Sequence, residues 1–134
     1  MESNSPEKKE LRTSEILVGI GYFLGDQKFV HDWEGWNKFF YKMKGEYAIL
    51  RGLSFKKDYP FPESENLREA YSALVQSLLL ERLSAPSPKF PHRFSQNVKK
   101  IFEKDIEPYL NPEELGELEG LAKEFLAEFT FDKI

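Results

Sequence analysis

Apolar side chains recur every three or four residues along most of this 134-residue chain. That spacing matches one turn of an α-helix, so it predicts a fold built mainly from helices. Only residues 47–55 and 84–95 depart from it in a way that suits strands. We therefore expect a mainly α fold with a small β component, formed by residues 13–134 as one domain.

Capping residues mark where the predicted helices begin and end. The last helix has the strongest signal, because Asn111 is a good N-cap, Pro112 fits the first helical position and the two acids that follow favour the positive end of the helix dipole. Ser64 and Asn66 are alternative caps for the third helix. The five predicted helices run from 13 to about 24, from 32 to about 43, from 64 to 83, from 95 to about 108, and from 112 to 129.

Two stretches between these helices lack a clear helical pattern. Residues 46–55 fit either a continuation of the second helix or a strand, with 53–55 as the strand. Prolines then stop regular structure at 60–62, and three further prolines predict a stiff loop from 84 to 94. Residues 1–12 are mostly polar, and we expect them to form a disordered tail.

The net charge of −4 is spread unevenly along the chain. Residues 107–134 hold eight acids against two bases, whereas residues 82–104 hold six bases against one acid. An acidic chain is not a general binder of polyanions, but a local positive stretch can contact phosphate. The alternative interpretation of that stretch is an ordinary solvated face.

Composition excludes several classes of function. The chain has no Cys, which excludes disulfides, thiolate catalysis and Cys-ligated metal. No apolar run approaches the roughly 20 residues that a membrane span needs. The N-terminus also lacks the apolar stretch of a secretory signal, so we expect a cytoplasmic protein with no membrane partner.

The sequence also lacks the common motifs of catalysis and cofactor binding. His31 and His92 stand far apart and in no motif, and no zincin, nucleophile-elbow or phosphate-loop pattern occurs. Gly19 and Gly21 lie inside a helical pattern, where they favour the close approach of a neighbouring helix over dinucleotide binding. We expect no cofactor, no metal ion and no catalytic residues. The alternative is a small helical enzyme with acidic residues in a cleft.

The polar face of the third predicted helix is the best candidate for a binding site. Arg68, Ser72 and Gln76 are spaced four residues apart, so they form one stripe away from the leucine face. Arg and Gln make paired hydrogen bonds to base edges, and Ser donates to a base or a phosphate. The loop beyond this helix adds cationic side chains from the positive stretch. The predicted nucleic-acid-binding residues are Arg68, Ser72, Gln76, Lys89, His92 and Arg93.

Other side chains favour a different kind of partner. Glu65, Glu69 and Glu81 on the same predicted helix repel phosphate, so they count against a polyanion surface. The apolar stripe of the last helix is widened by Leu121 and Leu126, which favours a homodimer. The acidic outer side of that helix is in turn a candidate surface for a protein partner, or a cover within the chain.

Taken in order, helix, helix, short strand, helix and wing-like loop resemble a winged helix-turn-helix domain with extra helices at the C-terminus. Residues 59–64, Tyr-Pro-Phe-Pro-Glu-Ser, are followed by Leu67. This stretch is similar to the Tyr-Gly-Pro-aromatic-Ser turn of some prokaryotic winged-helix families, including antitoxin-associated Panacea-like domains. It lacks the glycine and has one inserted residue.

That resemblance covers residues 14–95. It implies binding of double-stranded DNA through the third helix and the wing, in a transcriptional regulator or an antitoxin-like protein. The alternative is a protein-interaction module that uses the acidic helix 112–129, since many winged helices bind proteins.

Overall fold

The computed structural model describes residues 11–57, 60–83 and 91–130. It is mostly helical with one small antiparallel sheet, which confirms the expected fold class at that level. Short turns of 3₁₀ helix lie at Ala48–Leu50 and Glu107–Tyr109, and a π-helical turn, Phe102–Ile106, continues α4. The helices are α1 (Thr13–Leu24), α2 (Trp33–Lys44), α3 (Glu65–Gln76), α4 (Asn97–Ile101) and α5 (Pro112–Phe129), and the strands are β1 (Phe29–Val30), β2 (Leu80–Arg82) and β3 (Pro91–Phe94).

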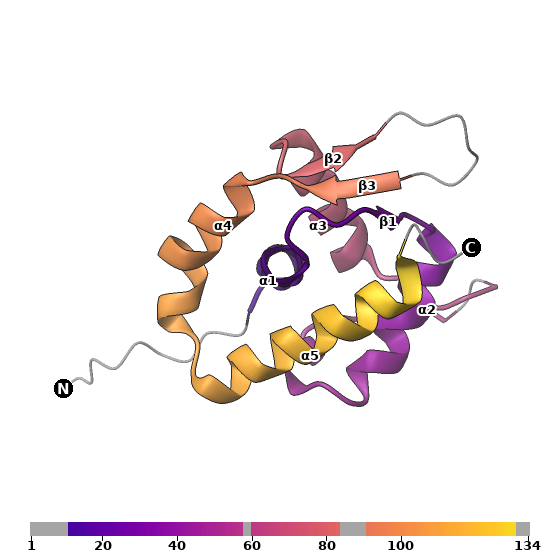
Figure 1. The fold of residues 1–134 in the computed structure, drawn as a ribbon. Coiled ribbons are helices and arrows are strands. Elements are labelled where there is room, and N and C mark those ends of the chain that lie inside the picture. Colours follow the sequence, from indigo (N-terminus) through magenta and orange to yellow (C-terminus); the bar gives the residue numbers. More distant parts are fainter. Residues whose placement is uncertain (1–10, 58–59, 84–90, 131–134) are drawn as a thin grey trace.

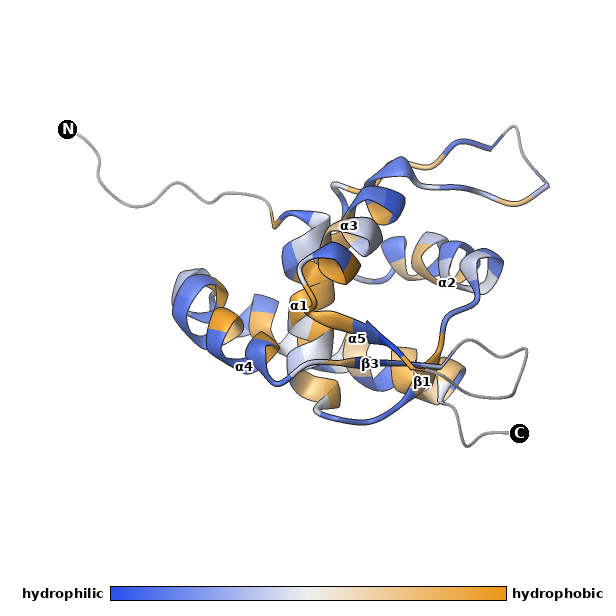
Figure 2. Ribbon diagram, turned by 90° about the horizontal axis from the view of Figure 1, so that it is seen from above, coloured by the Kyte–Doolittle hydropathy of each residue, from blue (hydrophilic) through white to orange (hydrophobic). Residues whose placement is uncertain are grey.

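Helix α1 occupies the centre of the molecule. Figure 1 looks along this helix, with the sheet on one side, α5 crossing on the opposite side and α4 beside it. Figure 2 shows α1 as a largely hydrophobic helix, as expected for one that is covered on several sides. Neither α1 nor any other helix in the described residues is long and apolar enough to cross a membrane.

Two glycines let neighbouring elements approach α1 closely. A Cβ at Gly19 would lie 2.9 Å from a methyl carbon of Leu118 on α5, and one at Gly21 would lie 2.5 Å from the Phe94 ring on β3. The expected close approach of a helix is therefore confirmed at Gly19. At Gly21 the close neighbour is a strand.

Gly21→Ala is expected to lower the free energy of unfolding by about 1–3 kcal/mol, because Phe94 must shift to make room for the methyl group. Gly116→Ala on α5 is the matched control. A Cβ there meets nothing within 4 Å, so the better helix propensity of Ala should stabilise the protein by about 0.5–1 kcal/mol. Urea denaturation followed by circular dichroism measures both changes. Equal effects of the two substitutions would contradict the close packing at Gly21.

The sheet has the order β1-β3-β2, and both outer strands run antiparallel to β3. Strands β2 and β3 form a hairpin in which Leu80 pairs with Phe94 and Arg82 pairs with His92. Strand β1 lies between α1 and α2 in the sequence, and it pairs Phe29 with His92 on the other edge of β3. The sheet therefore joins the segment after α1 to the segment after α3.

One predicted strand and one predicted helix end are wrong. Residues 53–55 form no strand, so the expected order of helix, helix and short strand is wrong: the 3₁₀ turn Ala48–Leu50 lies between α2 and α3, and the first strand, β1, lies between α1 and α2. The third helix, predicted to reach residue 83, ends at Gln76, because Leu78 takes a left-handed φ of 64° at the turn into β2. The leucines that follow keep a helical apolar spacing, so the period alone does not reveal this turn.

The aromatic side chains of α2 and α5 meet in the core. Trp36, Phe40 and Phe125 are fully buried, and the rings of Trp36 and Phe125 lie 5.3 Å apart. Helix α5 begins as the sequence predicts: Glu114 N donates to Asn111 Oδ1 at 2.7 Å, and Asn111 N donates to Glu114 Oε1 at 3.0 Å. This reciprocal cap fixes the start of the helix that closes the core.

The wide apolar stripe of α5 is used within the chain. Leu118, Leu121 and Phe125 are buried in the core, and Leu126 is half-buried against it. The stripe therefore needs no second copy of the chain to cover it. The width of this stripe therefore no longer supports a homodimer, which stays a prediction.

Candidate nucleic-acid interface

Helix α3 presents a polar face to solvent. Of the two predicted caps, buried Ser64 is the one used: its Oγ accepts from Leu67 N at 3.2 Å. The backbone N–H of Ser64 donates to Oδ1 of Asn37 on α2 at 2.8 Å, so the start of α3 is fixed to α2. The exposed residues of the helix are Glu65, Arg68, Glu69, Ser72, Ala73 and Gln76.

Arg68 lies on that face, but its charge is already engaged. Its guanidinium lies 5.0 Å from the centre of the Trp33 ring, and its Nη2 donates to Glu63 Oε2 at 2.7 Å. Its Nε also lies 3.5 Å from Oε1 of Glu65. The Trp33 indole donates to the same Glu63 oxygen at 2.8 Å. Any contact between Arg68 and DNA must therefore compete with two carboxylates.

Ser72 and Gln76 are the unengaged polar members of the predicted stripe. Both side chains are exposed, and neither is hydrogen-bonded to another residue that the structure describes. They stand one helical turn apart, so their Cβ atoms are about 6 Å from each other. These two side chains are available to a ligand that lies along α3.

Arg82 and Arg93 lie on the hairpin that follows α3. Arg93 donates from Nε to Oε1 of Glu81, the residue opposite it on β2, at 3.2 Å. Arg82 is exposed and forms no ion pair within the described residues. Sequence reasoning missed Arg82 because it put this residue at the end of a helix. Lys89 lies outside the described residues.

His92 is not at the surface, so its prediction as a nucleic-acid contact is wrong. It is only 2% exposed, because its side chain lies on the covered face of β3. Its Nε2 lies 2.9 Å from the hydroxyl oxygen of Tyr71 on α3, within hydrogen-bond distance. Sequence reasoning assigned residue 92 to a loop, and a loop assignment does not predict whether a side chain is buried or exposed. In the structure His92 ties the hairpin to α3.

His31 belongs to the same cluster and was not predicted. Its ring stacks on Tyr71 with centroids 4.2 Å apart and meets the edge of Trp36 at 4.7 Å. Its Nε2 is buried and has no hydrogen-bond partner. Burial lowers the pKa of His31 from 6.5 to about 4; His92 acts in the same direction, and Asp32 opposes it. His31 is therefore neutral at pH 7.

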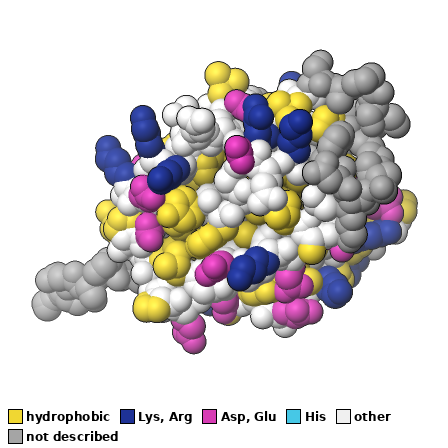
Figure 3. Space-filling model, viewed as in Figure 1, with side chains coloured by type: hydrophobic (Ala, Val, Ile, Leu, Met, Phe, Trp, Pro, Cys, Tyr) yellow, Lys and Arg dark blue, Asp and Glu magenta, His cyan; other side chains and the backbone are white. Residues whose placement is uncertain are grey.

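The positive stretch of the sequence is divided between two elements. Arg82 and Arg93 lie on the hairpin, whereas Lys99, Lys100 and Lys104 are exposed on α4 and the turn that continues it. Figure 3 shows basic side chains gathered on the side of the molecule where Figure 1 places α4. The stretch therefore does not form one patch beside α3.

Several acids of α5 are bound within the chain. Glu117 Oε1 accepts from the backbone N–H of Ile49 at 3.0 Å. Glu124 Oε2 accepts from the hydroxyl of Tyr47 at 2.6 Å, and this bond raises the pKa of Tyr47 to about 12. These carboxylates hold α5 against the segment after α2. The helix acts as a cover within the chain, and its use as a protein-binding surface stays a prediction.

Two further findings bear on what the chain binds. Among the residues that the structure describes, no three His, Cys, Asp or Glu side chains gather as metal ligands would. Comparison with protein-family models, with curated proteins and with solved structures finds no match to this chain.

Proposed function

We propose that this chain is a DNA-binding domain of the winged helix-turn-helix type, acting in regulation. The observation that carries the proposal is the order of its elements. A helix, a strand, two helices and a hairpin follow one another, and the first strand pairs with the last to give the sheet order β1-β3-β2. In a winged helix this order presents the third helix to the major groove and the hairpin to the backbone.

Each exposed group then has a distinct role on DNA. Ser72 and Gln76 on α3 have the hydrogen-bonding groups that read base edges. On the hairpin, Arg82 has no ion pair among the described residues and supplies the charge that contacts phosphate, and Arg93 adds a second contact when it exchanges Glu81 for a phosphate. His92 and Tyr71 support this surface from below, through their contact between β3 and α3.

The charges near α3 set a limit on affinity. Glu63 and Glu65 hold Arg68, and Glu69 adds a further negative charge on the exposed face. Most of the attraction to phosphate must therefore come from the hairpin. We expect binding that is weak for random sequence and lost steeply with salt.

The test is fluorescence anisotropy with a mixed-sequence DNA duplex, starting at about 50 mM salt and rising. Binding in the micromolar range is expected at low salt, and replacing both Arg82 and Arg93 with Ala should reduce the salt slope by about two. The double variant Lys38→Ala and Lys123→Ala is the matched control. It removes the same charge from exposed i,i+4 ion pairs on α2 and α5, away from the hairpin.

Two results would reject the proposal. One is no binding at tens of micromolar protein at low salt. The other is an equal loss of slope in the control, which would mean attraction by overall charge and not by the hairpin. The surface of α3 would then be tested against protein partners.

A further inference from the structure

Two adjoining cavities follow the seam between α1 and α3 toward α4, and together they are called the groove here. Its first part is a cavity of about 420 Å³ at the start of α1. Its second part is a cavity of about 220 Å³ between α1, the end of α3 and α4. Ser14 and Ala73, two residues with small side chains, line both cavities, so the cavities adjoin at these positions.

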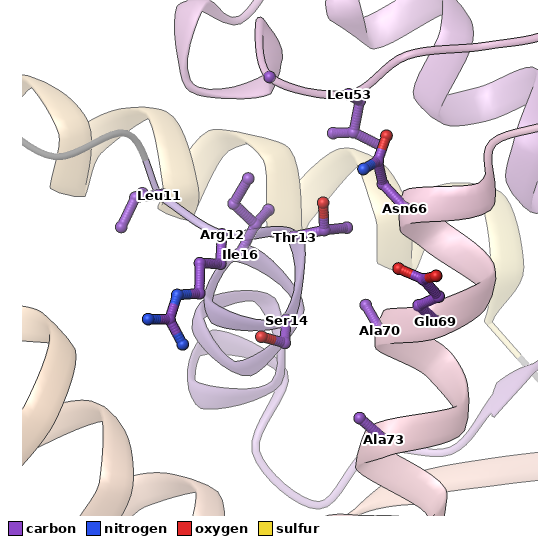
Figure 4. Close-up of a pocket in the computed structure, with 11 residues that line it drawn as sticks. Leu11, Arg12, Thr13, Ser14, Ile16, Leu53, Asn66, Glu69, Ala70 and Ala73 are labelled. Carbon is purple, nitrogen blue, oxygen red and sulfur yellow. The ribbon is translucent and has the colours of Figure 1, made fainter.

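The first cavity has a polar wall that includes the carboxylate of Glu69. In Figure 4 the side chains of Thr13, Asn66 and Glu69 face the gap between α1 and α3, whereas the Arg12 guanidinium points away from α3. Asn66 Oδ1 already accepts from the backbone N–H of Ser54 at 2.9 Å. Glu69 is exposed and forms no ion pair within the described part of the chain.

The second cavity has apolar walls. Val18, Leu74 and Ile106 form its buried side, and Leu79 and Ile101 are half-buried at its edge. The carboxylates that line it belong to Glu15 and Asp105. Arg12 is the one cation among the described residues that line either cavity, against three acids, so the groove as a whole attracts positive charge.

Two unusual backbone features border the apolar cavity. Leu78 lies between lining residues Ser77 and Leu79, keeps a φ of 64° and leaves 73% of its surface exposed. On the opposite wall, Ile106 ends the π-helical turn that continues α4. Left-handed non-Gly residues and π-helical turns cost free energy, and they cluster at functional sites.

We propose that this groove binds a cationic amphiphile, with its ammonium group beside Glu69 and its apolar chain against Leu79 and Ile106. The groove adjoins the proposed DNA surface without including Arg68, Ser72 or Gln76, because Glu69 and Ala73 lie on the flank of α3 beside that stripe. Glu69 and Ser77 are eight residues apart on α3, which corresponds to about 12 Å along the helix axis. Octyl and decyl chains match that length.

The test uses n-octylammonium, and n-octanoate as the probe with the same chain and the opposite charge. Each is titrated into ¹⁵N-labelled full-length protein below its micelle concentration, and amide chemical shifts are followed by NMR. We expect saturable shifts confined to the groove. Octylammonium should bind at least about fivefold more tightly than octanoate, because Glu69 attracts one head group and repels the other.

Three variants locate the site. Glu69→Gln should weaken octylammonium binding about fivefold and remove the preference over octanoate. Ala73→Leu places a larger side chain where the two cavities adjoin, so it should weaken the binding of both probes. Residue 73 is exposed on α3, and Leu is a good helix former, so the variant should fold. Glu65→Gln removes an exposed acid of the same helix that does not line the groove, so it should leave binding unchanged. The amide spectrum of each free variant reports whether it is folded.

The proposal is overturned if the two probes bind equally, if the shifts spread over the whole surface, or if Glu65→Gln weakens binding as much as Glu69→Gln. It is also overturned if folded Ala73→Leu binds like the wild type. None of these measurements contains DNA, so their outcome is independent of the proposed DNA binding.

Discussion

Replacing Phe125 with Ala is expected to lower the free energy of unfolding by about 3–5 kcal/mol. The Phe125 ring is fully buried, and its centre lies 5.3 Å from both Phe29 on β1 and Trp36 on α2. It lies 4.9 Å from Phe129, one turn further along α5. Removing the ring leaves a cavity at the junction of three elements, which the surrounding backbone can fill only in part.

Urea denaturation at pH 7 measures this change, with Leu126→Ala as the control on the same helix. Leu126 is only half-buried, so its truncation should cost about 1 kcal/mol. Domains of this size have a free energy of unfolding of about 5–15 kcal/mol, so Phe125→Ala will remove a large part of it. Should that variant be unfolded, Phe125→Leu keeps most of the volume and gives a measurable loss. An unchanged midpoint in both Phe125 variants would contradict the central position of α5.

Acidification is expected to destabilise the protein through His31. In the unfolded chain this side chain has a pKa near 6.5, whereas in the folded protein burial lowers the pKa to about 4. Between these values the unfolded state binds a proton that the folded state does not, so stability is lost as the pH falls from 6.5 toward 4. Solvent reaches the half-buried ring, so we expect a loss of about 2 kcal/mol.

The comparison that isolates His31 is wild type against His31→Phe, each unfolded in urea at several pH values between about 7 and 4. Phe keeps an aromatic ring against Tyr71 and Trp36 but does not titrate. Groups that do not interact with His31 contribute equally to both profiles and cancel in the difference. The wild type should lose about 2 kcal/mol more than the variant over this range. Parallel profiles would mean that His31 is protonated equally well in the folded state.

The helices were predictable where the local signals are redundant. In α5 the cap, the proline, the acids and the apolar period all agree, and the helix spans 112–129 as expected. Strand β1 has two residues, Phe29–Val30, which is too short for any alternation to be read from the sequence. Its existence depends on β3, which lies more than sixty residues further along the chain.

The candidate site was predictable only in part, for a related reason. Helical spacing correctly places Ser72 and Gln76 on the exposed face of α3, because that argument needs only local geometry. Arg82 and His92 depend on a strand pairing: they lie opposite each other, so their side chains share one face of the sheet, where His92 is buried and Arg82, at the end of the edge strand β2, stays exposed. Sequence reasoning assigned residue 82 to a helix and residue 92 to a loop. It therefore did not consider the buried and exposed faces of a strand at these positions. His92 was therefore assigned to the surface and Arg82 was overlooked.

The pairing of β1 also constrains when the protein can fold during its synthesis. Phe29 pairs with His92 on β3 and forms an isolated bridge with Thr130, just after α5. A ribosome therefore makes Phe29 and the aromatic face of α2 long before the segments that cover them. Contacts this distant close large loops, which slows folding and lengthens the exposure of apolar surface. The nascent chain must wait for α5 before its core can close, so this domain completes its folding only after Thr130 has left the ribosome.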